Sequence, residues 1–206
     1  MLKIWGRKNS TNVRKVLWCA EEAGVAYQRF DAGGAFGVVD KPEFLARNPN
    51  GLVPVLEDGD LVLWESNSIV RYLAAAYATG ALYQADPASR ASADKWMDWT
   101  TSTFAGAFRE LFWGTLRTPV ERRDLAAIEA ARQHCIALLA LPEQALGEHD
   151  YLSGDAFGMG DIPLGCFIYA WFEMPIERPP LPNLQAWYAR LRERPAYQRA
   201  VMTELT

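Results

Sequence analysis

A carboxylate and three small polar side chains interrupt the apolar stretch "LVLWESNSIVRYL" (residues 61–73), where a strand pattern becomes a helix pattern. Ser66 or Asn67 could cap the free backbone N–H groups at the start of a helix. Capping does not require the carboxylate of Glu65. A carboxylate beside spare N–H donors would suit a ligand that carries both an ammonium and a carboxylate group.

A second polar group, Ser10, Thr11 and Asn12 in "KNSTNVRKV", lies between the first predicted strand and the first predicted helix. Ligands of parallel α/β units bind at such carboxyl ends of strands. The helix dipole favours negative charge at this position, so a thiol held there would have a lowered pKa. Because the same residue types are the preferred helix caps, capping alone is the competing interpretation.

A third candidate is Val53–Pro54 in "GLVPVL", at the entrance of a predicted strand. A cis peptide bond before Pro54 would turn the N–H and C=O groups of Val53 outward, where they could pair with a peptide-like ligand. Only about 5–6% of X–Pro bonds in folded proteins are cis. A trans proline at the first residue of an edge strand is therefore the alternative.

The elements that must position these residues lie in a first part with mixed strand and helix signals. Two strand patterns, "LKIW" and "AYQRFD", flank a helical pattern at 13–20, which predicts a parallel pair with a right-handed crossover. Two further strands flank Asp58–Gly59, a strong hairpin signal, and a helix begins near Ser66. From Asp86–Pro87 onward only helical periods occur. The sequence thus predicts an α/β domain followed by an all-α domain.

Within the helical part, the apolar spacing from Trp96 to Leu111 predicts a helix of more than four turns. Thr118–Pro119 ends it, and another helix is expected over about 120–146. The segment 158–172 is apolar all round, which is typical of a buried helix. One or two closing helices are predicted over 182–201.

The composition is ordinary for a globular protein, with 50% hydrophobic and 22% charged residues among 206. The net charge of −4 gives no support to nucleic acid or an anionic membrane as a partner. No apolar run approaches the 18 or so residues that span a bilayer. The three scattered cysteines form no disulfide framework and the two histidines lack zinc spacing. We therefore expect a cytoplasmic protein with reduced thiols and no metal.

Taken in order, "NSTNVRKV", "NPNGLVPVL", "LWESNSIVRYL" and "GDIPLG" resemble the soluble glutathione S-transferase family over nearly the whole chain. The resemblance is to serine-type, bacterial theta- and nu-like members. It implies a thioredoxin-like domain of order βαβ-α-ββα at residues 1–79 and a helical-bundle domain at residues 87–206. It also implies that glutathione is the co-substrate.

The resemblance assigns Glu65 to the ammonium of the γ-glutamyl unit of glutathione and Ser66 to its carboxylate. Val53, before a cis proline, would pair through its backbone with the cysteinyl unit. Ser10 matches the serine whose hydroxyl hydrogen-bonds the thiolate, whereas nu-like members use an asparagine that corresponds to Asn12. The predicted catalytic residues are Ser10 and Asn12, and the predicted glutathione-binding residues are Ser10, Thr11, Val53, Pro54, Glu65 and Ser66.

In the family the electrophile lies against the helical domain, so Phe104, Phe108, Trp113 and Arg117 are candidates for lining its pocket. Phe104 and Phe108 could equally be core or dimer contacts. The implied function is conjugation of the glutathione thiolate to a small hydrophobic electrophile, as in detoxification, by a homodimer. A glutathione-dependent disulfide reductase and a non-catalytic binding module of the same fold stay open as alternatives.

One departure from the family pattern concerns Gly158. The family often has the Ser or Thr of a capping box at this position, three residues before the aspartate that is Asp161 here. Because glycine caps adequately, we expect a modest loss of stability and unchanged chemistry.

Overall fold

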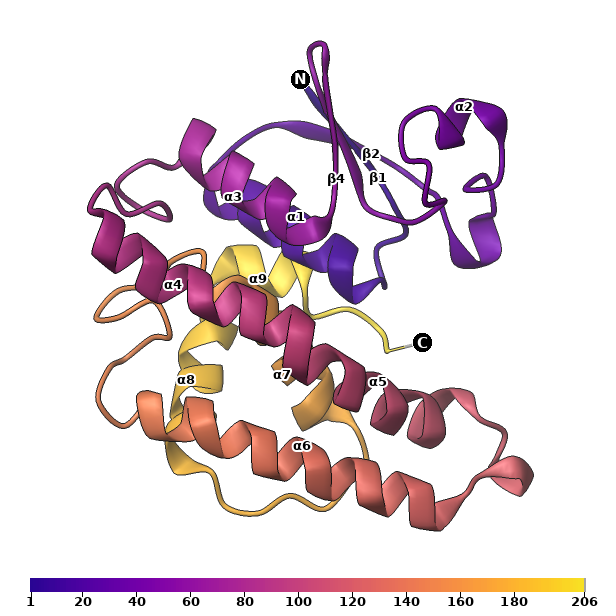
Figure 1. Ribbon diagram of the computed structural model, residues 1–206, viewed down its shortest axis with the longest axis vertical. Helices are drawn as coiled ribbons and strands as arrows, with labels where there is room; N and C mark the ends of the chain where they lie inside the picture. Colours follow the sequence, from indigo (N-terminus) through magenta and orange to yellow (C-terminus); the bar gives the residue numbers. More distant parts are fainter. Residues whose placement is uncertain (206) are drawn as a thin grey trace.

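The computed structural model describes residues 1–205 and consists of an N-terminal α/β part packed on a C-terminal helical part (Figure 1). In Figure 1 helices α1 and α3 lie between the sheet and the helical part. The expected order βαβ-α-ββα is confirmed. The N-terminal elements are β1 (Leu2–Trp5), α1 (Thr11–Glu22), β2 (Tyr27–Phe30), the 3-10 turn η1 (Gly34–Phe36), α2 (Pro42–Leu45), β3 (Val55–Asp58), β4 (Leu61–Trp64) and α3 (Ser66–Tyr77).

The sheet has the strand order β2-β1-β3-β4, with β1 parallel to β2 and antiparallel to β3. The parallel pair is joined through α1, as the strand–helix–strand pattern predicts. The hairpin of β3 and β4 turns at Gly59, whose φ of 58° is a conformation that favours glycine. The β1–α1 loop and the segment before β3 consequently meet at one edge of the sheet, because β1 and β3 are neighbours.

The helical part begins with α4, whose side-chain N-cap Asp86 accepts a 2.7 Å hydrogen bond from the Ser89 backbone N–H. A π-helical turn joins α4 to α5, and no break occurs before Thr118. No helix within residues 1–205 is long and apolar enough to cross a membrane. The elements are α4 (Pro87–Trp99), η2 (Thr100–Phe104), α5 (Ala105–Phe112), η3 (Trp113–Arg117), η4 (Val120–Arg122), α6 (Leu125–Ala145), α7 (Asp161–Glu173), α8 (Pro182–Arg192) and α9 (Pro195–Ala200).

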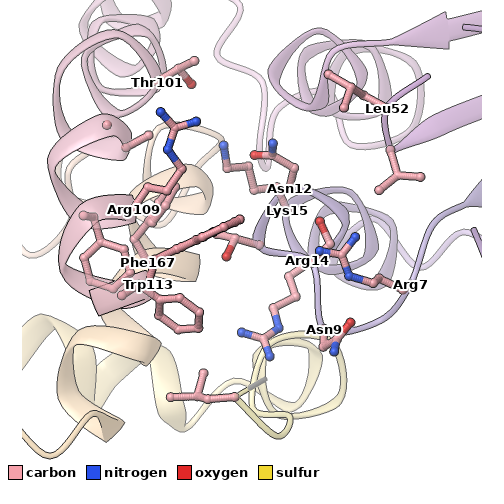
Figure 2. A pocket seen from close by; sticks show the side chains of 18 of the residues that line it. Arg7, Asn9, Asn12, Arg14, Lys15, Leu52, Thr101, Arg109, Trp113 and Phe167 are labelled. Atoms are coloured by element: carbon pink, nitrogen blue, oxygen red, sulfur yellow. The ribbon is translucent and has the colours of Figure 1, made fainter. Parts of the chain in front are cut away.

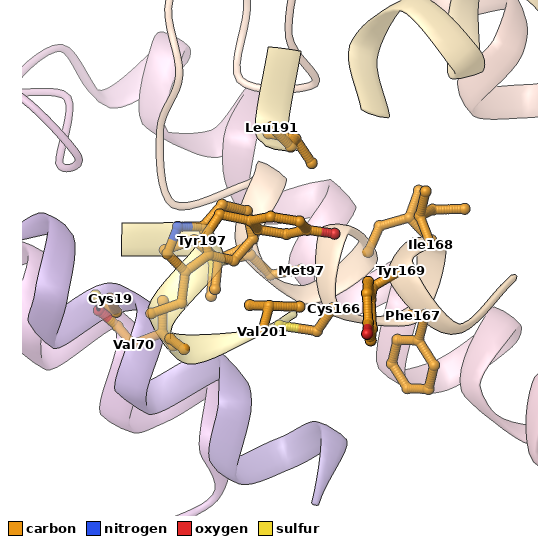
Figure 3. Close-up of a cluster of buried hydrophobic side chains, with 14 of the residues drawn as sticks. Cys19, Val70, Met97, Cys166, Phe167, Ile168, Tyr169, Leu191, Tyr197 and Val201 are labelled. Carbon is orange, nitrogen blue, oxygen red and sulfur yellow. Dashed lines mark hydrogen bonds between the residues drawn. The ribbon is translucent and has the colours of Figure 1, made fainter. Parts of the chain in front are cut away.

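The two parts share one hydrophobic core, in which side chains of α1 and α3 pack against α4, α7 and α9 (Figure 3). Gly165 of α7 allows close contact here, because a Cβ added at Gly165 would lie 2.7 Å from the Trp18 ring. The Trp18 and Tyr197 rings meet edge to face with centroids 4.7 Å apart. The Tyr197 hydroxyl donates a 2.9 Å hydrogen bond to the Gly165 carbonyl, so its polar group is satisfied inside the core.

Helix α7 begins at the fully buried Asp161. Its carboxylate accepts hydrogen bonds from the loop before the helix and from α8. It accepts hydrogen bonds from the Leu152 N–H (2.8 Å), the Gly158 N–H (3.1 Å) and the Trp187 indole N–H (2.9 Å). A Cβ added at Gly158 would lie 2.9 Å from the Ser153 Cβ and Oγ. Ser153 thus occupies the space that a larger residue at 158 would need.

The Asp161→Ala variant should have a free energy of unfolding lower by about 3 kcal/mol, because three buried donors lose their acceptor. Urea denaturation followed by tryptophan fluorescence measures this difference. The matched control is Asp155→Ala, which removes an exposed carboxylate from the same loop and should cost less than about 1 kcal/mol. Equal losses in the two variants would show that the Asp161 network does not hold the start of α7.

Candidate active site

A cavity of about 590 Å³ opens between the N-terminal end of α1 and helix α5, where the two parts of the molecule meet (Figure 2). Its walls come from the β1–α1 loop, the first turns of α1, the segment before β3 and α5 with its flanking turns. Of the predicted site residues, those that line it are Ser10, Thr11, Asn12, Val53, Phe108, Trp113 and Arg117.

Ser10 is the N-cap residue of α1, with extended backbone angles of φ −78° and ψ 125°. Its side chain makes no capping hydrogen bond, so capping does not account for the hydroxyl. The Asn12 carboxamide oxygen lies 3.3 Å from the Ser66 hydroxyl, which donates to it. This contact joins the first turn of α1 to the first turn of α3.

Glu65 precedes α3 with φ 71° and ψ 112°, and it is one of two non-glycine residues with positive φ within residues 1–205. Such backbone conformations cost about 1–3 kcal/mol and cluster at ligand sites. The Glu65 side chain is exposed, whereas Ser66 is buried at the start of the helix, where backbone N–H groups lack intrahelical partners. An anionic acceptor and N–H donors are thus adjacent, next to the cavity wall that Asn12 forms.

Val53 lines the cavity and precedes a cis peptide bond to the buried Pro54. The conformation that the sequence interpretation left open is therefore the cis one. Within residues 1–205, the N–H and C=O groups of Val53 take part in no backbone hydrogen bond. Both groups are available to an extended peptide ligand in the cavity.

The predicted electrophile-pocket residues separate into two groups. Phe108, Trp113 and Arg117 line the cavity, and the Arg117 guanidinium lies 5.2 Å from the centroid of the half-exposed Trp113 ring. Phe104 does not line it. Its ring is fully buried and packs against those of Trp99 and Phe108, with centroids 5.8 and 5.6 Å away, so Phe104 is a core residue.

Comparison with known proteins agrees with this geometry. The model of the glutathione S-transferase N-terminal domain matches residues 1–75, and that of the C-terminal domain matches residues 126–190. Glutathione S-transferase GstB of Escherichia coli is 50% identical over 204 residues, which cover 98% of each chain. The chain belongs to the glutathione S-transferase family. The resemblance inferred from its motifs is confirmed.

Solved structures also support the fold of this glutathione S-transferase. The theta class glutathione S-transferase from Xanthomonas axonopodis pv. citri with glutathione bound superposes with a TM-score of 0.97 at 68% identity, covering 100% of this chain and 99% of that one. Its apo form gives a TM-score of 0.88 at 63% identity, covering 100% and 98%. Glutathione transferase F7 from Populus trichocarpa gives 0.86 at 25% identity, with 98% of each chain covered.

The sequence analysis did not predict that cationic side chains line the cavity of this transferase. Four further cationic side chains line it: Arg7, Arg14, Lys15 and Arg109. Arg14 and Lys15 are buried, although they come soon after the polar stretch at 10–12 and have the sequence pattern of ordinary solvated helix residues. The Lys15 ammonium lies 5.3 Å from the centroid of the Phe167 ring. Burial lowers the pKa of Lys15 to about 8, and the charge of Glu65 partly opposes this shift.

The buried charge of Lys15 makes a testable contribution to pH-dependent stability. Below pH 8 Lys15 is charged in both states, and the folded state bears its desolvation cost. Between pH 8 and the ordinary lysine value of 10.5, the unfolded chain binds more protons, so stability rises with pH. At pH 8 and below, Lys15→Met should be more stable than wild type, because it buries no charge. As wild type gains stability between pH 8 and 10.5, the difference in unfolding free energy between the two should fall by about 3 kcal/mol.

Denaturant unfolding at a series of pH values measures this difference. Lys41→Met, at an exposed position in the same domain, is the matched control and should differ from wild type by a constant amount at every pH. A pH-independent difference for Lys15→Met would show that Lys15 is ionised equally in the folded and unfolded states.

Proposed function

We propose that this glutathione S-transferase binds reduced glutathione between α1 and α3 and uses its thiolate to attack a small hydrophobic electrophile held against α5. The observation that carries the proposal is the Ser10 hydroxyl at the N-terminus of α1, which has no side-chain capping bond within residues 1–205 and shares one cavity with Val53. A hydroxyl donor and the helix dipole both stabilise a thiolate relative to a thiol. The chemistry is then attack by sulfur with departure of the leaving group.

In this proposal the γ-glutamyl unit lies at the start of α3. The Glu65 carboxylate pairs with its ammonium, and Ser66 with its backbone N–H receives its carboxylate. The backbone of Val53 pairs with the cysteinyl unit, and the thiolate reaches Ser10. Thr11 contributes to the same wall of the cavity, and the buried Pro54 holds the segment before β3.

Ser10 is the stronger candidate for the thiolate donor. The Asn12 side-chain oxygen accepts a hydrogen bond from Ser66, so Asn12 contributes to positioning the start of α3 and has only its amide N–H groups to offer a thiolate. Disulfide reduction through a protein thiol is disfavoured because the three cysteines are buried, and burial raises the pKa of Cys19, Cys135 and Cys166. A non-catalytic module is disfavoured because it has no use for the costly backbone conformation of Glu65.

The electrophile pocket consists of the α5 side of the cavity, where Phe108 and Trp113 supply apolar surface and Arg117 lies over the rings of Phe112 and Trp113. We also propose a homodimer. Exposed apolar side chains on the edge strand β4 and at the end of α3 support this assignment; they are Leu61, Val62, Trp64 and Tyr77. The buried free cysteines are consistent with a reducing compartment such as the cytoplasm.

Ser10→Ala should keep glutathione affinity but raise the pKa of the bound thiol, with a loss of about 10- to 100-fold in kcat/KM at neutral pH. Titration calorimetry in two buffers of different ionisation enthalpy counts the protons released on binding, and the thiolate absorbance near 240 nm gives the pKa. Ser92→Ala, at an exposed position of α4, is the control. If Ser10→Ala keeps full proton release while Asn12→Ala loses it, Asn12 is the thiolate donor.

Glu65→Gln should weaken glutathione binding about 10- to 100-fold, because the ammonium loses its ionic partner. Glutathione without its amino group provides the matched ligand. Wild type should bind this analogue about as weakly as Glu65→Gln binds glutathione, and Glu65→Gln should bind both ligands alike. A large preference for glutathione that persists in the variant would place the ammonium elsewhere.

A further inference from the structure

The cavity has an unbalanced charge. Arg7, Arg14, Lys15 and Arg109 line it, and no aspartate or glutamate is among its lining residues within 1–205. None of these four cations forms an ion pair in the described part of the chain. The Nε atom of Arg14 is buried and has no hydrogen-bond partner there. Since unpaired charges in a partly buried site are costly, this arrangement indicates anionic ligands.

Glutathione accounts for only part of this charge, given the proposed function on which this inference rests. Its γ-glutamyl end lies at Glu65 and Ser66. There the Glu65 carboxylate pairs with the ammonium and the Ser66 N–H binds the carboxylate, so this end needs none of the four cations. The thiolate and the glycyl carboxylate are the two remaining anionic groups. Bound glutathione therefore leaves positive charge in excess around the cavity, and this excess is available to the second substrate.

Arg109 is the cation placed to meet that second substrate. It extends from α5 toward the wall that Asn12 and Lys15 form (Figure 2). Ala105 and Gly106, which also line the cavity, are small and leave space beside it. Within residues 1–205 the Arg109 side chain is exposed and makes no hydrogen bond or ion pair. The fork of N–H donors on a guanidinium matches a carboxylate.

We propose that this transferase prefers electrophiles that carry a carboxylate beside an apolar reacting group, with the carboxylate bound by the guanidinium of Arg109. The aromatic rings of Phe108 and Phe112 then receive the apolar part, and the reacting carbon faces the thiolate near Ser10. In the reaction a C–S bond forms at that carbon while the bond to the leaving group, for example a halide, breaks. The leaving group departs with the bonding electron pair, and no oxidant or proton donor is required.

Electrostatics across the cavity support this preference. Burial lowers the pKa of Arg7, and the nearby charge of Arg117 lowers it further. Arg7 belongs to the β1–α1 loop and lines the cavity. An anion that enters the cavity stabilises the charge of Arg7, whereas a neutral electrophile of the same shape does not.

The test compares 4-(bromomethyl)benzoate with 4-(bromomethyl)benzamide, which share the reacting carbon and leaving group and differ in charge. Each kcat/KM is divided by the rate constant of the uncatalysed reaction with glutathione. Wild type should favour the benzoate by about tenfold or more. Arg109→Gln should abolish this preference, because benzoate conjugation falls about tenfold or more further than benzamide conjugation does.

Arg122→Gln is the matched control, because it removes the same charge from an exposed position outside the cavity and should keep the preference. Benzamide conjugation without a preference for benzoate would overturn the inference and leave the transferase function standing. A preference that survives in Arg109→Gln would also overturn it. If neither compound reacted faster than in the uncatalysed reaction, the transferase function itself would fail.

Discussion

Burial of helix α1 between the sheet and the helical part is the constraint on which the site depends. Trp18 packs against the backbone of Gly165. One turn further on, at the last residue of the helix, Glu22 accepts two 2.7 Å hydrogen bonds from the Arg194 guanidinium. With contacts on both sides, the axis of α1 is fixed relative to α7 and α9. The position of Ser10 and the direction of the helix dipole follow from that packing.

The same packing explains how α3 can start with an unfavourable backbone conformation at Glu65. Strained residues persist only where the surroundings determine them. Two hydrogen bonds connect α3 to α4: the Asn67 amide donates to the Met97 carbonyl (2.7 Å), and the Arg71 guanidinium donates to Asp94 (2.6 Å). The hydrogen bond from Ser66 to Asn12 connects α3 to α1. The start of α3 is thus held by both parts of the molecule.

The elements of the fold could be predicted from sequence because the signals for them are local: the strand–helix–strand pattern, the hairpin at Asp58–Gly59 and the uniformly apolar α7. The α5 side of the cavity could not be predicted in this way. Phe104 and Phe108 lie on one buried face, as the periodic spacing predicts, and their ring centroids are 5.6 Å apart. Spacing does not show which part of a buried face borders a cavity: Phe108 and Arg109 line it, whereas Phe104 does not.

The charge of the cavity also shows why net charge says little about a site. The chain carries a formal charge of −4, which suggests no affinity for anions. Burial of Arg14 and Lys15 beneath the α1 N-terminus concentrates positive potential where the surrounding protein excludes water. Fields in such a cleft are focused, whereas exposed carboxylates elsewhere are screened within about 10 Å by salt. An acidic protein can therefore present positive charge in a cavity, because the fold decides which charges face it.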